Sequence, residues 1–499
     1  MTHQERVIDD IKDNAGVMSP ERLTDLLAQG RRQRPLGFDE VSRAIALRYE
    51  GDQVKILKDA LMKAYPRTWQ RMPIDPVGWL RFFARQDSGV YTQAASRNVM
   101  VGDIVDEEAT AALARYADSA GIDDVMLEVE RRCKTGMKSA AVMLGWRKIT
   151  TDDPGELVAH VYYPHDVVTI SHPSAPDDPR ALVAVAVRQA RLDTGIKSDL
   201  WWVWSREPVE GDDGTLISFG PWSHRRVSED GKMATPAMVY DGERLPIVIC
   251  RTAPGAGGVW PEPDRDVVVN VDSLNVSRSN RQHVINMQAH SQLVVNSKTK
   301  EEADIVVGPD VPLIFQEEGA SAQYLVSGAD HEAIKASASR DLEELGVSRG
   351  NNPDAYAVEP GEAQSGVSRM IANAPHDQLV AESRPAFKRF EESHLWPTII
   401  DVVNAFDPAY TFPADARVDV EFAKGKTYED DAAKTERILL LLDRGLIDEA
   451  EALVELGRFG SRADAEASLA ARQSTRAPAL PGRFEGGPFT QRETTEATE

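Results

Sequence analysis

The sequence has little that would build a disulfide framework, a zinc site or a membrane span. Its two cysteines, Cys133 and Cys250, stand far apart and outside any Cys-x-x-Cys pair, so we expect two small buried residues. No apolar run reaches the roughly 18 residues of a transmembrane helix. The segment Met1 to Ile11 is polar and lacks the apolar centre of a signal peptide. We therefore expect a protein without a membrane partner that stays in the cytoplasm until it is used.

Motifs that carry catalytic chemistry are also missing. The sequence has no His-Glu-x-x-His and no Gly-x-Ser-x-Gly. The glycine-rich segment Gly255–Gly258 precedes Trp260 rather than Gly-Lys-Ser/Thr, so it does not predict a nucleotide site. The segment Ser365–Ser368 resembles half of a nucleophile elbow, but the second glycine and a preceding strand are absent. We predict no catalytic residue, no cofactor and no enzyme activity.

Two groups of residues have competing interpretations. His165–Asp166 and His172 could be drawn into a metal site, but no third ligand at helical spacing accompanies them, and we predict surface or satisfied histidines. Trp201, Trp202 and Trp204 could stack on bases, although in an acidic chain a packing role is favoured.

Length and charge limit the remaining possibilities. A chain of 499 residues predicts about three domains. Its formal net charge of −23 argues against tight wrapping of nucleic acid, because such binding needs cations to replace the counterions on phosphate. The charge is compatible with a wall past which DNA slides, and the simplest interpretation is solubility alone.

The N-terminal part of the chain has helical signals. Residues 1 to about 65 are predicted to be helical, with Ser19 as an N-cap, Pro20 at the first helical position and Gly51 as a helix stop. Prolines and a glycine between 73 and 78 then break the pattern.

The next region changes period. Residues 79 to 145 are predicted to be helical, with one packed amphipathic helix from Ala120 to Met143. From 146 to 250, alternating apolar residues separated by Pro, Asp and Gly clusters predict strands, mostly antiparallel.

The rest of the chain predicts a long series of elements. In order, these are a helix at 263–287, short strands at 293–325, a helix at 329–345 stopped by Gly346, a polar loop at 349–364, helices at 365–372 and 377–406, a strand at 418–422, and helices at 427–442, at 448–456 and from 461. Pro385 and Pro397 are expected to kink or break the helix at 377–406. Residues 473–499 are rich in Pro, Gly, Thr and Glu and are expected to be disordered.

This order of helix, short strands, helix, polar loop and kinked helix has no catalytic explanation. The loop is long for a compact domain, and such loops are usually functional or disordered. The helices carry narrow apolar stripes, which need neighbours to bury them. Side-by-side packing in a ring would supply such neighbours.

From residue 40 to 472 the sequence resembles the portal proteins of tailed double-stranded DNA bacteriophages. The element Arg48–Gln53 is similar to a Tyr-x-Gly-Asp-Gln motif near the portal N-terminus. The segments Leu245–Val248, Gly255–Trp260 and Asp264–Gln288 look like the end of the wing and the first stem helix. Element order and total length carry this resemblance.

The resemblance implies an α+β fold, a portal-like multidomain subunit with a helical wing plus β-rich part, helical stem, small α/β clip, long kinked helix and helical crown. The implied parts are a wing at 1–262 with its strand-rich part at 146–250, stem helices at 263–290 and 329–348, a clip at 291–328, a tunnel loop region at 349–373, a long kinked helix and wing return at 374–426, a crown at 427–472 and a disordered tail at 473–499.

The family also implies a function and partners. Its members form a dodecameric homo-oligomeric ring at one capsid vertex, through which double-stranded DNA passes during packaging and ejection. The implied partners are the terminase large subunit, the major capsid protein and head-tail connector or adaptor proteins, and the implied location is the virion. Candidates to face the tunnel are Arg278, Arg281, Lys335, Asn351, Asn352 and Gln364.

Three alternatives remain open at this point. The tunnel candidates are otherwise ordinary solvated or inter-subunit polar residues. The chain could be another virion structural protein, such as a minor head or connector component. A nucleic-acid-processing enzyme is disfavoured, because no clustered metal-binding carboxylates occur at convincing spacing.

Overall fold

The chain folds as an α+β protein, as predicted. The computed structural model describes residues 18–150, 153–189, 199–210, 216–230, 234–289, 292–296, 321–325, 366–423, 431–444 and 447–456, with single residues from 336 to 346 and at 468–469. It divides into two compact units. Unit 1 is Met1–Glu362 with Ala372–Gly425, and unit 2 is Ala363–Ile371 with Lys426–Glu499. Within the described residues, no helix combines the length and apolarity needed to cross a membrane.

The N-terminal helices begin and end where local chemistry predicts. Helix α2 (Pro20–Arg32) starts at Ser19, whose hydroxyl accepts from the backbone N–H of Arg22 at 3.3 Å. Gly51 ends α3 (Phe38–Glu50), as predicted. Asp52 then caps α4 (Gln53–Ala64) by accepting from two backbone N–H groups. A short 3-10 helix, η1 (Trp69–Arg71), precedes α5 (Trp79–Asp87).

The prediction of a continuous helical region from 79 to 145 is wrong. It contains β1 (Ser96–Val101), β2 (Ile104–Val105), α6 (Glu107–Ala120), α7 (Ile122–Arg132) and the π-helix η2 (Cys133–Met137). Gly121, at a left-handed φ of 61°, separates α6 from α7. The end of the helix predicted from Ala120 to Met143 is instead the start of β3 (Ser139–Arg147), whose first six residues are all buried. A strand buried on both faces has no alternation to distinguish it from a buried helix.

The region predicted to form strands consists of antiparallel sheets. All strand pairs among the described residues are antiparallel. One sheet has the order β12-β3-β4, and a larger one has the order β11-β10-β7-β6-β5. Their strands are β4 (Glu156–Tyr162), β5 (Val167–Ser171), β6 (Leu182–Gln189), β7 (Leu200–Ser205), β10 (Ser223–Ser228), β11 (Met238–Val239) and β12 (Ile247–Arg251). A separate pair joins β8 (Pro208–Glu210) to β9 (Leu216–Phe219).

Strand β6 is buried on both faces, although its sequence suggested alternation. Val183, Ala184 and Ala186 pack in a cluster with α2, whereas Leu182 and Val185 pack with residues of β3 and β12 in another. Short 3-10 helices, η3 (Pro164–Asp166) and η4 (Pro179–Ala181), flank β5. The five-stranded sheet therefore lies between two cores.

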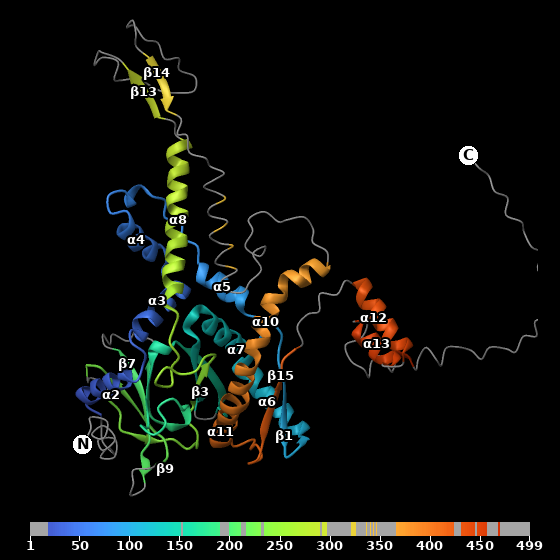
Figure 1. Ribbon diagram of the computed structural model, residues 1–499. Coiled ribbons are helices and arrows are strands. Elements are labelled where there is room, and N and C mark those ends of the chain that lie inside the picture. Colours follow the sequence, from blue (N-terminus) through green and yellow to red (C-terminus); the bar gives the residue numbers. More distant parts are fainter. Residues whose placement is uncertain are drawn as a thin grey trace, which may run out of the picture. The chain divides into compact units, whose positions relative to one another are not determined.

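Helix α8 (Arg265–Ala289) confirms the helix predicted at 263–287. Figure 1 shows it leaving the sheet region with α3 and α4 beside it. Next in the chain is β13 (Gln292–Asn296), which pairs with β14 (Ser321–Leu325). The strands predicted between these two lie outside the described residues. Of the helix predicted at 329–345, the described residues Ala336, Arg340 and Glu343 are helical, and so is Gly346, the predicted stop.

The chain returns through α10 (Gly366–Phe390), which joins two predicted helices into one. It continues through Pro375 and Pro385, so the break expected at Pro385 does not occur. The interruption is the π-helix η7 (Glu391–Leu395), followed by α11 (Trp396–Phe406) with Pro397 in its first turn. Strand β15 (Arg417–Glu421) then pairs with β1, which closes the sheet β15-β1-β2.

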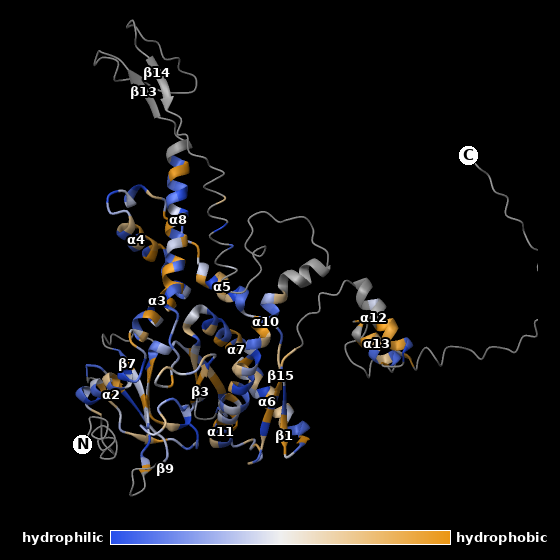
Figure 2. Cartoon of the chain, viewed as in Figure 1, coloured by the Kyte–Doolittle hydropathy of each residue, from blue (hydrophilic) through white to orange (hydrophobic). Residues whose placement is uncertain are grey.

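Unit 2 contains α12 (Asp431–Asp443) and α13 (Glu449–Glu455), close to the predicted positions. Asp448 and Glu451 form a capping box at the start of α13. Figure 2 shows apolar residues on both helices, and Leu439 and Leu440 are about half exposed, at 55% and 48%. Of the third predicted helix, the described residues are Ser468 and Leu469, which are helical; its Ser461 start lies outside the described part, as does the tail at 473–499.

The largest core of unit 1 is organised around a buried carboxylate, Glu391, which is fully buried in η7. It accepts hydrogen bonds from Tyr91 Oη at 2.6 Å, Arg97 Nε at 2.8 Å and Trp396 Nε1 at 2.7 Å. Burial and the Glu391 charge raise the pKa of Tyr91 well above its usual value, so the phenol stays a donor. These contacts join β1 and the preceding loop to the start of α11.

A second buried carboxylate, Glu130 on α7, holds that same loop. It accepts from the backbone N–H groups of Gly89, Val90 and Tyr91 at 2.8, 2.9 and 3.0 Å. Both cysteines, Cys133 and Cys250, are free and buried in the surrounding core, as predicted.

Removing the Glu391 carboxylate tests this arrangement. Glu391→Ala leaves the Arg97 guanidinium, 9% exposed, without its buried partner, and should lower the free energy of unfolding by about 3–5 kcal/mol. Asp123→Asn is the control, because it removes the exposed partner of the same arginine and should cost less than about 1 kcal/mol. Urea unfolding of both variants measures the difference, and equal losses would show that Glu391 has no special role.

Candidate functional site

One side of α8 is held against α3, α4 and the 73–78 segment. Arg48 donates two hydrogen bonds to the Asp272 carboxylate, from Nε to Oδ1 at 2.8 Å and from Nη2 to Oδ2 at 2.5 Å. The Asn275 side chain, only 6% exposed, donates to the Val77 carbonyl at 3.1 Å and accepts from its N–H at 3.0 Å. Val271 packs between α3 and α5. The helix is therefore fixed to the fold by these polar contacts together with an apolar row, in which Val267, Val268 and Leu274 accompany Val271.

The opposite side of α8 is exposed along the length of chain that those contacts fix. We call it the free face of α8, consisting of Asp266, Val269, Asn270, Ser273 and Ser277. Val269 is 62% exposed. The spacing of three and four residues places these side chains on one side of the helix. From Asp266 to Ser277 this face extends about 17 Å along the helix.

The two predicted tunnel arginines on α8 have different environments. Arg278 faces the held side, where its Nη2 lies 2.7 Å from Asp75 Oδ2. Arg281 follows Ser277 by four residues and so extends the free face, and it makes no ion pair with any residue that the structure describes. The other predicted tunnel residues, Lys335, Asn351, Asn352 and Gln364, lie outside the described residues.

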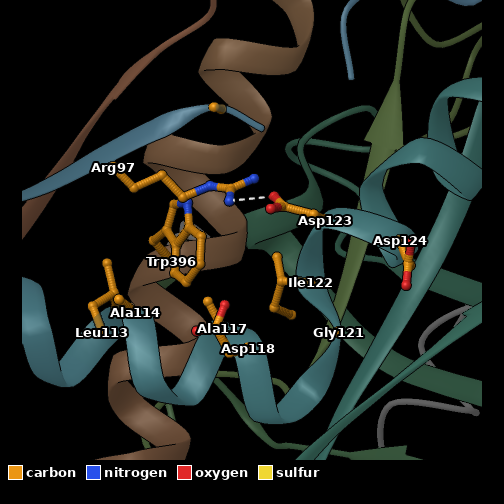
Figure 3. A pocket seen from close by; sticks show the side chains of 11 residues that line it. Arg97, Leu113, Ala114, Ala117, Asp118, Gly121, Ile122, Asp123, Asp124 and Trp396 are labelled. Atoms are coloured by element: carbon orange, nitrogen blue, oxygen red, sulfur yellow. Dashed lines mark hydrogen bonds and ion pairs between the residues drawn. The ribbon is translucent and has the colours of Figure 1, made fainter. Parts of the chain in front are cut away.

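A cavity of about 380 Å³ lies where β1, α6, α7 and α11 meet, and Figure 3 shows the side chains that line it. Arg97 lies over the Trp396 ring at 5.2 Å and reaches Asp123 at 2.5 Å, while Asp118 and Asp124 line the cavity. The charge of Arg97 is thus neutralised by Glu391 and Asp123, and the cavity presents no nucleophile beside a base. No group of three potential metal ligands occurs in the described part of the chain.

The candidate metal-site histidines are satisfied by neighbouring groups. His165, 7% exposed, is hydrogen-bonded with Ser42 Oγ at 3.1 Å, and His172 Nδ1 lies 2.7 Å from Ser174 Oγ. Burial, with smaller contributions from Arg188 and Arg43, lowers the pKa of His165 to about 4. These histidines are structural, as predicted.

The tryptophans of β7 are also packing residues. Trp201 and Trp204 are 2% and 3% exposed and belong to two different cores. The half-buried Trp202 ring is covered by the Arg226 guanidinium, 4.6 Å from the ring centroid. None of the three presents a free face to a base.

The glycine-rich loop has a packing explanation. A Cβ at Gly258 would lie 2.2 Å from the Gln33 carbonyl oxygen, and one at Gly255 would lie 1.9 Å from the Gly258 carbonyl. The glycines therefore permit close backbone contact with the segment after α2. Gly366 and Ser368 of the possible nucleophile elbow are helical residues of α10, which is not the strand-turn-helix context that the motif requires.

Sequence reasoning missed the partners that hold α8. Arg48 and Asp272 are 224 residues apart, and Val77 and Asn275 are 198 apart, so nothing local marks them as partners. Arg48, near the end of α3, positions α8 through this pair.

Comparisons with known proteins give similarity at the level of whole structures. No protein-family model matches the chain, and no curated protein matches it. A chain from the neck of an empty gene transfer agent particle is 12% identical, with a TM-score of 0.39, covering 80% of this chain and 93% of that one. A chain from the virion of a native gene transfer agent particle is 11% identical, with a TM-score of 0.39, covering 82% and 94%. Similarity this distant carries no argument on function.

The pKa of His165 predicts a specific pH dependence. The fold favours the neutral form of His165, so its contribution to the free energy of unfolding is fully present above about pH 6.5. This contribution, at most about 3 kcal/mol, is lost as the pH falls toward 4. His165→Gln should therefore lose less stability than the wild type between pH 7 and 5, as measured by urea unfolding. The exposed His160, changed to Gln, is the control. Parallel pH profiles for the wild type and His165→Gln would refute the assignment.

Proposed function

We propose that the chain is a portal-like structural subunit, which forms a ring at one vertex of a phage-type capsid and surrounds the channel for DNA. The observation that carries this proposal is the free face of α8. A long helix is fixed by its neighbours on one side, leaves the other side open, and continues into the β13–β14 pair. Such a helix is suited to stand beside copies of itself around an axis.

The proposed parts follow the sequence prediction. The sheets of unit 1 and its helices other than α8 would form the wing. The stem would consist of α8 and the helical residues Ala336, Arg340, Glu343 and Gly346, and β13 with β14 would belong to the clip. In unit 2, α12 and α13 belong to the crown. The exposed Leu439 and Leu440 of α12 support this assignment, because a neighbouring copy would bury them.

We assign the part of the free face around Val269 to the contact with a neighbouring copy, and Arg281, about three turns further along α8, to the channel. Ser273 and Ser277 are small and uncharged, so they permit close approach of another helix or of DNA without strong attraction. Arg281 is our preferred channel-facing cation, since Arg278 is already paired with Asp75. The net charge of −23 limits sticking of DNA to the wall. Lys335, Asn351, Asn352 and Gln364 remain proposed channel residues.

The proposed partners are those of such a vertex: double-stranded DNA, the terminase large subunit, the major capsid protein and a head-tail connector protein. The subunit itself would have no enzymatic role, with ATP hydrolysis left to the packaging motor.

A charge on the free face should prevent assembly. Val269→Asp places a carboxylate where we propose that a neighbouring copy packs, and burying an unpaired charge is costly. Sedimentation velocity should give a mass many times the 55.0 kDa subunit for the wild type and a monomer for the variant.

Ile149→Asp is the matched control, because Ile149 is 78% exposed outside α8 and should tolerate the charge. Circular dichroism and the melting temperature should be unchanged in both variants. A Val269→Asp protein that assembles like the wild type would exclude the free face of α8 as the subunit contact.

A further inference from the structure

A second cavity of unit 1 concentrates positive charge. It has a volume of about 190 Å³ and lies between η4, the ends of β6, β7 and β12, and the η7–α11 junction. We call it the arginine pocket, lined by the cationic or titratable side chains of Arg180, Arg206, Arg244 and His394, with Trp222 and Thr398 among its other walls.

Arg206 is the cation held most firmly in the pocket. Its Nε donates to the Leu182 carbonyl at 2.7 Å and its Nη2 to the Arg180 carbonyl. The guanidinium carbon lies 3.5 Å from the Phe219 ring centroid and 4.5 Å from that of Trp222. No carboxylate among the described residues pairs with it, and burial alone lowers its pKa to about 10. A cation that is removed from water without a carboxylate gains from an added anion.

The surrounding charges leave an excess of cations. Arg180 pairs with Asp178 at 2.9 Å, whereas Arg244 makes no ion pair with any described residue. Arg251, close by, donates to the carbonyls of Asp177 and Val259.

The acids near the pocket do not cancel that excess. Glu243 also lines it, and Asp401 accepts from the backbone N–H groups of Glu243 and Arg244, both at 3.0 Å, which fixes the loop that carries Arg244. The pKa of His394 is lowered, first by burial and then by the charges of Arg251 and Arg180. The pocket is thus a preformed region of positive potential.

We propose that the arginine pocket binds a small oxyanion, a carboxylate or a phosphate. Guanidinium groups present N–H donors in a planar fork that matches both anions. The volume is below the roughly 300 Å³ of a pocket for a drug-sized ligand, so it suits one small anion or one side chain. Two sources of this chemistry exist: free phosphate, and an acidic side chain of a second copy of this chain, which has 80 acidic residues against 57 basic ones.

Calorimetric titration of the full-length chain with inorganic phosphate, at constant ionic strength set with chloride, tests the site. Saturable binding should occur in the wild type and weaken at least about tenfold in Arg206→Gln and Arg244→Gln. Arg147→Gln is the control, since Arg147 is an exposed arginine of β3 that pairs with Glu156 outside the pocket. If Arg206→Gln fails to fold because it loses its backbone contacts, Arg244→Gln still decides, as its exposed side chain has no described ion pair.

Self-association distinguishes the two sources. If phosphate does not bind, but Arg244→Glu reduces assembly at low salt while Arg147→Glu does not, the ligand is a carboxylate of a second copy. If Arg244 variants match the wild type in both phosphate binding and assembly, the proposal is wrong. The phosphate titration needs no ring, so it can succeed or fail independently of the proposed function.

Discussion

The buried Glu391 carboxylate is the interaction on which the architecture of unit 1 depends. Two of its partners, Tyr91 and Arg97, lie some 300 residues earlier in the chain. The third, Trp396, lies about one helical turn later. These hydrogen bonds join η7, between α10 and α11, to the sheet β15-β1-β2. A buried charge of this kind is stable only with all its partners in place, so it fixes where α11 begins.

That anchorage explains how α8 can keep a free face. On one side, α8 is held by the Arg48–Asp272 pair, by Asn275 and by an apolar row that includes Val271. These contacts fix the orientation of the helix without enclosing it. The uncharged residues opposite remain available to a second copy or to DNA, which is the property that the proposed ring requires. The arginine pocket, which lies beside the junction of η7 and α11, would add a charged contact to the same subunit.

The sequence predicts those features that depend on neighbouring residues. Ser19 and Asp448 begin helices, Gly51 ends one, and period-two segments between 146 and 250 form antiparallel strands. It fails where burial removes the pattern: the strand from Ser139 is apolar on both faces and looked helical. Pro385 does not end α10, since a helix packed into a core tolerates a proline that an isolated helix would not. Of the site, Arg278 and Arg281 could be placed on one helix, but which of them is free depends on Asp75, 203 residues away.

The most direct test of the central claim is an image of the assembled protein. Negative-stain electron micrographs of the purified full-length chain, recorded over a range of salt concentrations, should show closed rings with a central channel, viewed end-on. Monomers alone at high protein concentration, under every salt condition, would contradict the account.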